Sequence, residues 1–198
     1  MTLQLIFYTQ STPLEYYRAG KRFPFLKPHS CLHPDCRLPI PPRPYGYYSR
    51  NIISFGFTGR ILIRRYYCPR CGHTFSCLPS FCLPYYQYSL ALIWINLLCQ
   101  FFNLLPFLKA LAAYVNWHRQ HLQFYRKRFK NNLVFIKLVL RQLVPEIKLP
   151  EEMAIRKEAK KVLSIVTTDF PTVQTFSTRF FAQSNKSFMA SRGNSITL

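Results

Sequence analysis

The chain has 198 residues and a mass of 23.5 kDa, and it carries 27 Lys and Arg against 7 Asp and Glu, a net charge of +20. This length fits one or two small domains, and a hydrophobic content of 49% excludes wholesale disorder. The scarcity of carboxylates argues against metal-dependent nucleases and paired-carboxylate hydrolases, whereas the positive charge favours a polyanionic partner.

The N-terminus has no basic segment followed by an apolar run and a small-residue cleavage site, so we expect a reducing, cytoplasmic location. In such a compartment, closely spaced Cys pairs are more often metal ligands than disulfides. Two pairs are present, Cys31 with Cys36 and Cys68 with Cys71. We predict that they bind one zinc ion, which is structural because four thiolates leave no open coordination position.

Between the pairs, residues 51–57 and 60–67 are rich in β-branched and aromatic side chains. They predict a β-hairpin with Thr58 and Gly59 at its turn. Two Cys knuckles joined by a hairpin make a zinc ribbon, which we assign to residues 28–84.

His29 and His33 lie beside the first Cys pair. The favoured interpretation is that they are surface residues next to a closed site, and the spacing leaves open whether one of them replaces a cysteine ligand. Three further cysteines lie in apolar surroundings and are predicted to be buried thiols. They are Cys77, Cys82 and Cys99.

Residues 90–108 include 15 hydrophobic residues among 19 and carry no charge. Their length and apolarity make a membrane span one interpretation. However, the amide side chains of Asn96, Gln100 and Asn103 fall on one helical face. A helix surrounded by lipid gains nothing from such a polar strip. We therefore expect a core helix that touches water along this amide strip.

From residue 104 the apolar pattern predicts two short helices around a turn at residues 115–118, and then a helix over residues 131–143. The first two form a helix-turn-helix candidate. Trp117 and Tyr125 lie next to its inward stripe and are expected in the core. A further helix is predicted to open at residues 150–152.

The outward face of the second helix, which begins near Arg119, combines guanidinium, ammonium and amide groups that suit phosphates and base edges. The residues predicted to contact double-stranded DNA are Arg119, Gln120, Gln123, Arg126, Lys127 and Lys130. Residues 85–145 hold eight basic and no acidic side chains. An ordinary solvated helix face would explain the basic side chains but not the lack of acidic ones. The lack of acidic residues therefore favours contact with DNA.

The predicted fold class is α+β. It comprises an N-terminal extension (1–27), the zinc ribbon (28–84), an all-α helix-turn-helix-like bundle (85–166) and a loose tail (167–198). The tail is inferred from a composition rich in Thr, Ser, Gln and Asn.

Several stretches resemble bacterial insertion-sequence transposases, in their N-terminal zinc ribbon and helix-turn-helix, and a transposase-associated family of uncharacterised function. The similar stretches are residues 65–76, 78–81, 84–89, 111–114 and 122–129. The resemblance implies that the four paired cysteines bind zinc and that the helix beginning near Arg119 contacts DNA. It also implies a downstream nuclease domain with an acidic triad, for which this chain has neither the length nor the carboxylates.

We therefore expect a non-enzymatic, zinc-stabilised DNA-binding protein associated with transposition, located at the nucleoid. A separate transposase catalytic subunit is a further expected partner. Two alternatives stay open. One is a membrane-associated zinc protein anchored by residues 90–108. The other is a ribbon that binds single-stranded nucleic acid through exposed tyrosines, namely Tyr47, Tyr48, Tyr66 and Tyr67.

Overall fold

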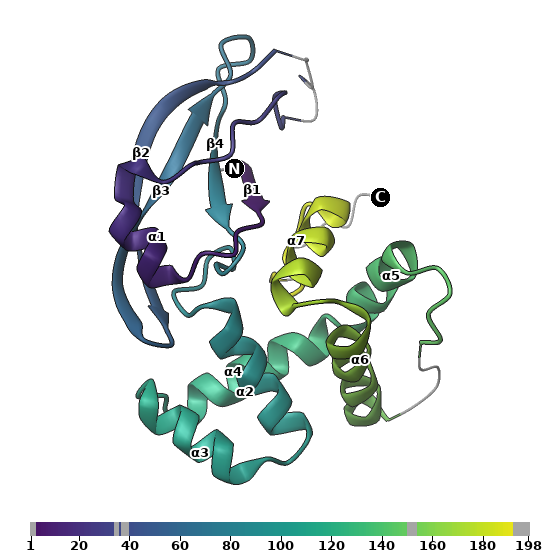
Figure 1. The fold of residues 1–198 in the computed structure, drawn as a ribbon. Helices are drawn as coiled ribbons and strands as arrows, with labels where there is room; N and C mark the ends of the chain where they lie inside the picture. Colours follow the sequence, from purple (N-terminus) through teal and green to yellow (C-terminus); the bar gives the residue numbers. More distant parts are fainter. Residues whose placement is uncertain (1–2, 34–35, 37–39, 150–153, 192–198) are drawn as a thin grey trace. The chain divides into compact units, whose positions relative to one another are not determined.

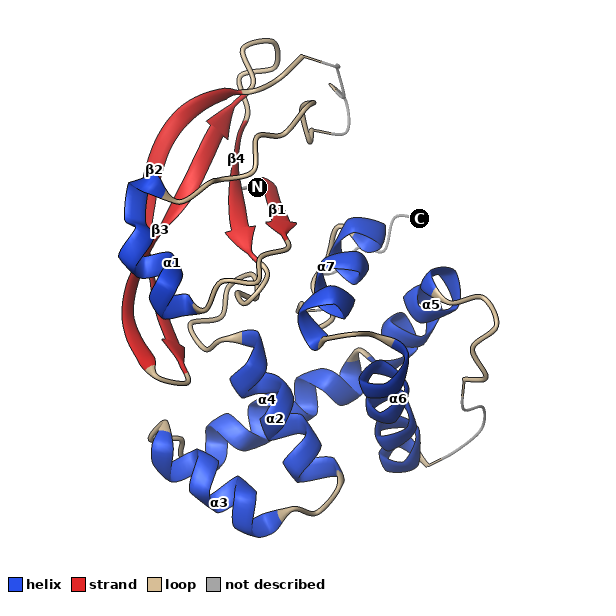
Figure 2. Ribbon diagram, viewed as in Figure 1, coloured by secondary structure: helices blue, strands red, loops and turns tan. Residues whose placement is uncertain are grey.

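The chain folds into two compact units, residues 1–89 and residues 90–198. The computed structural model describes residues 3–33, 36, 40–149 and 154–191. Within these ranges the first unit combines a sheet with short helices, and the regular elements of the second are all helices (Figure 1 and Figure 2). The α+β class predicted from the sequence is therefore confirmed.

A four-stranded sheet forms the centre of the first unit, with the spatial order β1-β4-β3-β2. Its strands are β1 (Leu3–Phe7), β2 (Arg43–Ser54), β3 (Phe57–Tyr67) and β4 (Thr74–Pro79). β1 runs parallel to β4, and the other neighbouring strands are antiparallel. Ile61, Ile63 and Phe75 are fully buried, so the two central strands carry the core.

The predicted hairpin is present, but its turn lies at Phe55 and Gly56 and not at Thr58 and Gly59. Gly56 has a φ of 69°, which suits a tight two-residue turn. Thr58 and Gly59 instead pair within the strands. A Cβ at Gly59 would come within 2.8 Å of the Phe57 ring, so this glycine permits a close ring contact and does not mark the turn.

The residues before the first Cys pair, expected as an extension, complete this unit. Helix α1 (Pro13–Ala19), followed by the short 3₁₀-helix η1 (Gly20–Arg22), begins with a capping box between Thr12 and Glu15. Tyr16 is 1% exposed, and its hydroxyl donates a hydrogen bond of 2.8 Å to the carbonyl oxygen of Leu62. Because β1 also pairs with β4, the N-terminal segment belongs to the core of the first unit.

The second unit is a set of six helices among the described residues. They are α2 (Leu90–Phe101), α3 (Leu105–Tyr114), α4 (Arg119–Asn131), α5 (Leu133–Leu143), α6 (Ile155–Asp169) and α7 (Val173–Ser184). The helices predicted between residues 104 and 143 are confirmed. Asn103 and Asn116 have φ values of 60° and 52° in the two breaks that flank α3. The helix start predicted at residues 150–152 lies outside the described residues, and α6 begins at Ile155.

The amide strip predicted to touch water is exposed only in part, because Asn96 is 0% exposed, Gln100 is half-buried and Asn103 is exposed in the break after α2. Gln100 donates hydrogen bonds through Nε2 to Asn96 Oδ1 at 2.9 Å and to the Leu122 carbonyl oxygen at 2.8 Å. These bonds connect α2 to α4 and satisfy Asn96 Oδ1, whereas the buried Asn96 Nδ2 has no hydrogen-bond partner among the described residues. Among the described residues, no helix combines the length and apolarity needed to span a bilayer.

The prediction of a loose tail from residue 167 was wrong for residues 167–191. α6 continues to Asp169, and α7 and the segment after it bury three phenylalanines to 0% exposure, Phe176, Phe180 and Phe188. Asn132 Nδ2 donates to the Phe188 carbonyl oxygen at 2.9 Å, which fixes that segment to the start of α5. The polar residues between these aromatics dominate the composition and hide their helical spacing.

Candidate metal centre

The second Cys pair lies in the turn between β3 and β4. The Gly72 N–H donates to the Cys68 carbonyl oxygen at 3.0 Å, and the Cys68 N–H donates to the His73 carbonyl oxygen at 3.0 Å. Gly72 has a φ of 72°, a backbone conformation that glycine adopts readily. This tight loop points the sulfurs of Cys68 and Cys71 to the same side.

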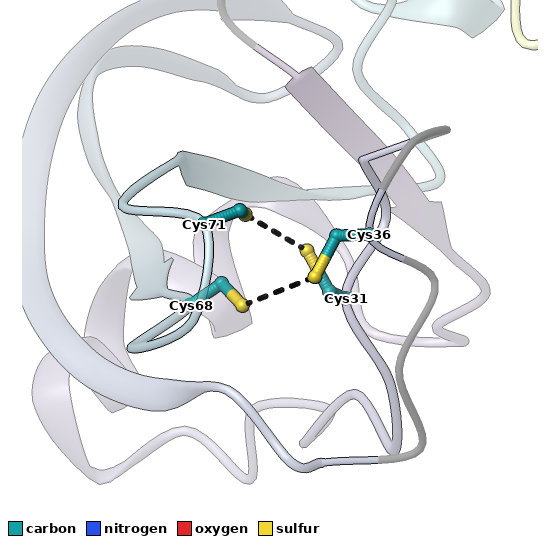
Figure 3. Close-up of side chains that lie close together, drawn as sticks. All are labelled: Cys31, Cys36, Cys68 and Cys71. Carbon is teal, nitrogen blue, oxygen red and sulfur yellow. Dashed lines mark hydrogen bonds between the residues drawn. The ribbon is translucent and has the colours of Figure 1, made fainter.

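The first Cys pair, in the loop between η1 and β2, faces the second (Figure 3). The Sγ atoms of Cys31 and Cys71 are 3.6 Å apart, and those of Cys36 and Cys68 are 3.8 Å apart. All four sulfurs lie within 4.8 Å of one another. Tetrahedral zinc–thiolate bonds of about 2.3 Å place sulfurs about 3.8 Å apart, whereas disulfide sulfurs are about 2.05 Å apart. The cluster therefore fits a bound metal ion and contains no disulfide.

Neither histidine near the first pair joins this cluster. Within the described ranges, the group of ligand atoms that could hold a metal comprises the four cysteines alone. His33 stacks on His73, with ring centroids 3.9 Å apart, and His29 is exposed. The two stacked rings lie on opposite loops of the site, so they connect these loops outside the sulfur cluster.

Two of the four thiols, those of Cys31 and Cys68, have pKa values shifted in opposite directions. The N–H groups of Cys71 and Arg70, hydrogen-bonded to the Cys68 sulfur, lower the pKa of that thiol to about 7. Burial raises the pKa of Cys31 to about 12, because a thiolate is poorly solvated there. Cys68 is therefore partly ionised at neutral pH, whereas Cys31 is expected to lose its proton only when a metal cation offsets the cost of burying its thiolate.

The remaining cysteines are buried thiols, as predicted. Cys77, Cys82 and Cys99 are 0%, 1% and 2% exposed. Burial raises the pKa of Cys77 and of Cys82 to about 12.

We expect residues 1–89 to lose stability as the pH rises from 9 towards 12. In the unfolded chain the thiols of Cys77 and Cys82 ionise with a pKa near 9, whereas in the folded unit burial raises the pKa of each to about 12. The folded state therefore binds more protons over this interval, so its stability is complete below pH 9 and falls above it. At about pH 10.5, each thiol is expected to lower the free energy of unfolding by about 1–2 kcal/mol.

This loss is measurable by urea denaturation followed by circular dichroism at about pH 8 and about pH 10.5. The Cys82→Ala variant is the control, because it should show a smaller decrease over the same interval. Equal decreases in the two proteins would show that the Cys82 thiol does not contribute.

The predicted DNA-contacting residues all lie on α4. Five of them are exposed and one is half-buried. The exposed residues are Arg119, Gln120, Gln123, Arg126 and Lys127, and the half-buried residue is Lys130. Tyr125 and Phe129, on the opposite side of the helix, are 4% and 1% exposed, and Trp117 is 5% exposed. The predicted core positions of Trp117 and Tyr125 are therefore confirmed.

A shallow depression of about 310 Å³ lies along the outward face of α4. It is lined by Gln123, Arg126, Lys127, Lys130 and Asn131. Asn131 was absent from the predicted set, although its position four residues after Lys127 places it on the same helical face. Helical spacing alone would have identified it.

One of the tyrosines predicted to be exposed on the ribbon is not. Tyr66 is 2% exposed, its ring stacks on Phe75 with centroids 5.8 Å apart, and its hydroxyl donates to the Leu26 carbonyl oxygen at 2.6 Å. It belongs to the core of the first unit, whereas Tyr47, Tyr48 and Tyr67 are half-buried.

Comparison with known protein families matches residues 33–98 to a domain of unknown function (DUF6431). The matched segment contains Cys36, Cys68 and Cys71 and ends within α2. No curated protein and no solved structure gives a significant match. The match assigns no chemistry to the segment.

Proposed function

We propose that the chain is a non-enzymatic DNA-binding protein that a single structural zinc ion stabilises and that acts in transposition. The observation that carries the proposal is the row of exposed basic and amide side chains on α4. These residues lie in a segment, residues 85–145, with eight basic and no acidic residues.

Zinc is the metal that the Cys cluster favours. Soft thiolates in a tetrahedral arrangement select zinc or iron–sulfur centres, and the separations of 3.6 and 3.8 Å fit a single ion with four ligands. When bound, the ion links the loop before β2 to the turn between β3 and β4. A small unit has a limited apolar core, so such a link contributes substantially to its stability.

The shape of α4 supports contact with duplex DNA. Its inner face is anchored by Tyr125 and Phe129, whose burial leaves the outer face accessible. The width of a major groove admits a helix, where guanidinium groups pair with guanine and amides with adenine. Arg119 and Gln123 are the residues expected to read bases, and the cations near the end of the helix are expected to hold phosphates.

We propose no strand-transfer activity for this chain, since five of its seven carboxylates fall within residues 146–169 and Glu158, one of these five, pairs with Lys137 at 3.0 Å. The resemblance to transposases suggests a separate transposase catalytic subunit as a second partner besides DNA. We propose that the protein acts in the cytoplasm, at the nucleoid. Nuclease chemistry of that kind requires carboxylates that converge on two metal ions.

The proposal predicts that the Arg126→Ala, Lys127→Ala double variant binds duplex DNA more weakly than the wild type and with a shallower salt dependence. Each lost phosphate contact should reduce the slope of log affinity against log salt by about 1. The measurement is retardation of a labelled duplex by zinc-loaded protein over a series of salt concentrations.

The control is the Lys157→Ala, Lys161→Ala double variant, which removes the same charge from exposed positions of α6. It should change the slope less than the α4 variant. If both variants reduce the slope equally, or if the wild type does not retard DNA at low salt, α4 is not a specific DNA contact.

A further inference from the structure

We infer that the end of the sheet next to the Cys cluster is a second nucleic-acid site, which binds a single strand by stacking an unpaired base on Tyr45. The site lies in the first unit, on strands β2 and β3. This site therefore consists of residues other than those of α4 that are proposed to contact duplex DNA.

The strand register brings the residues of this site to one face. Arg43 pairs with Tyr67, and Gly46 pairs with Arg65, while Tyr45 is the extra residue of a β-bulge between Pro44 and Gly46. Cross-strand partners in an antiparallel pair share a face of the sheet. A bulge redirects the side chain that it inserts, and bulges are frequent beside functional sites.

The exposed ring of Tyr45 is available for a base to stack on. Its side chain is 58% exposed, the Arg65 guanidinium lies 5.0 Å from its ring centroid, and the Tyr67 ring lies 6.0 Å away. Arg65 is itself held by a hydrogen bond of 3.2 Å from Nη2 to Thr74 Oγ1. An exposed ring whose neighbours are already fixed on strands loses little conformational freedom when a base stacks on it.

The surrounding charge suits the phosphates of such a strand. Arg43 at the start of β2 and Arg70 in the Cys68–Cys71 turn are both exposed. Residues 1–89 contain eleven basic and two acidic side chains. Guanidinium groups that flank an aromatic ring are the combination by which proteins hold single strands without reading their sequence.

The chemistry favours a single strand over a duplex. A tyrosine ring needs the π face of a base, and in a duplex those faces are covered by neighbouring bases. The ligand is therefore an unpaired base with its adjoining phosphates, a feature that DNA and RNA strands share.

The test measures the fluorescence anisotropy of labelled oligo(dT) and oligo(rU) with the zinc-loaded full chain at low salt. Tyr45→Ala should weaken binding by at least about fivefold, whereas Tyr45→Phe, which keeps the ring, should bind within about twofold of the wild type. Arg65→Ala should also weaken binding and reduce the salt dependence. Circular dichroism and zinc content should match the wild type in each variant.

Tyr85→Ala is the matched control, since Tyr85 is 79% exposed in the same unit and lies outside the cluster. It should bind like the wild type. Binding of either oligonucleotide with this dependence on Tyr45 supports the inference, and the preferred one identifies the sugar. Binding of neither, or equal losses in Tyr45→Ala and Tyr85→Ala, overturns it.

Duplex retardation measured in parallel separates this inference from the proposal on α4. If duplex binding does not depend on α4 while single-strand binding depends on Tyr45, only the α4 proposal fails. If the reverse holds, only the inference about the sheet fails.

Discussion

Replacing Cys68 with serine is expected to abolish metal binding and to lower the free energy of unfolding of residues 1–89 by more than about 3 kcal/mol. Cys68 is the cluster thiol whose pKa is lowered, to about 7, by hydrogen bonds from the N–H groups of Cys71 and Arg70. A hydroxyl stays protonated at neutral pH and is a poor ligand for zinc, so the closed site loses both a ligand and a charge. The loops that carry the two Cys pairs then lose their link.

The measurement is native mass spectrometry for the metal, with hydrogen exchange of residues 1–89 for the stability. The wild type should carry one zinc ion, and the variant none, with faster exchange in β3 and β4. Cys77→Ala is the control, because Cys77 is fully buried on β4 but lies outside the cluster, so that variant should retain the metal. A Cys68→Ser variant that keeps one zinc would show that Cys68 is not a required ligand.

Local patterns predicted the elements whose formation depends on neighbours in sequence. The inward stripe of α4, with Tyr125 and Phe129, follows the helical period, and the Cys68–Cys71 spacing identifies a knuckle without knowledge of the fold. The first Cys pair is predicted as a ligand pair from its close spacing and from the family resemblance, and the structure brings its sulfurs next to those of the second pair.

The predictions that failed depend on contacts between distant segments. β1 pairs in parallel with β4, Leu3 opposite Phe75, and no local pattern reveals such a partner. Tyr66 was expected to be exposed, yet the register turns it to the core while Tyr67 faces the other side of the strand. The bulge that presents Tyr45 likewise exists only once β2 and β3 have paired.

Replacing Phe176 with alanine is expected to lower the free energy of unfolding of residues 90–198 by about 3–5 kcal/mol. Phe176 is fully buried, and its ring centroid lies 5.3 Å from those of Phe170 and Phe188 and 5.5 Å from that of Phe180. It also lies 6.2 Å from the ring of Trp94 on α2. Truncation removes buried ring area and leaves a cavity among rings that cannot all move inward.

Denaturant titration followed by tryptophan fluorescence reports on this unit, because both tryptophans of the chain, Trp94 and Trp117, lie within residues 90–198. Gln183→Ala is the control, since Gln183 is an exposed residue of α7 whose substitution should change the free energy of unfolding by less than about 1 kcal/mol. If the two variants unfold alike, α7 is not part of this core. If only Phe176→Ala is destabilised, the segment after residue 167 contributes to the core of the helical unit that contains α4.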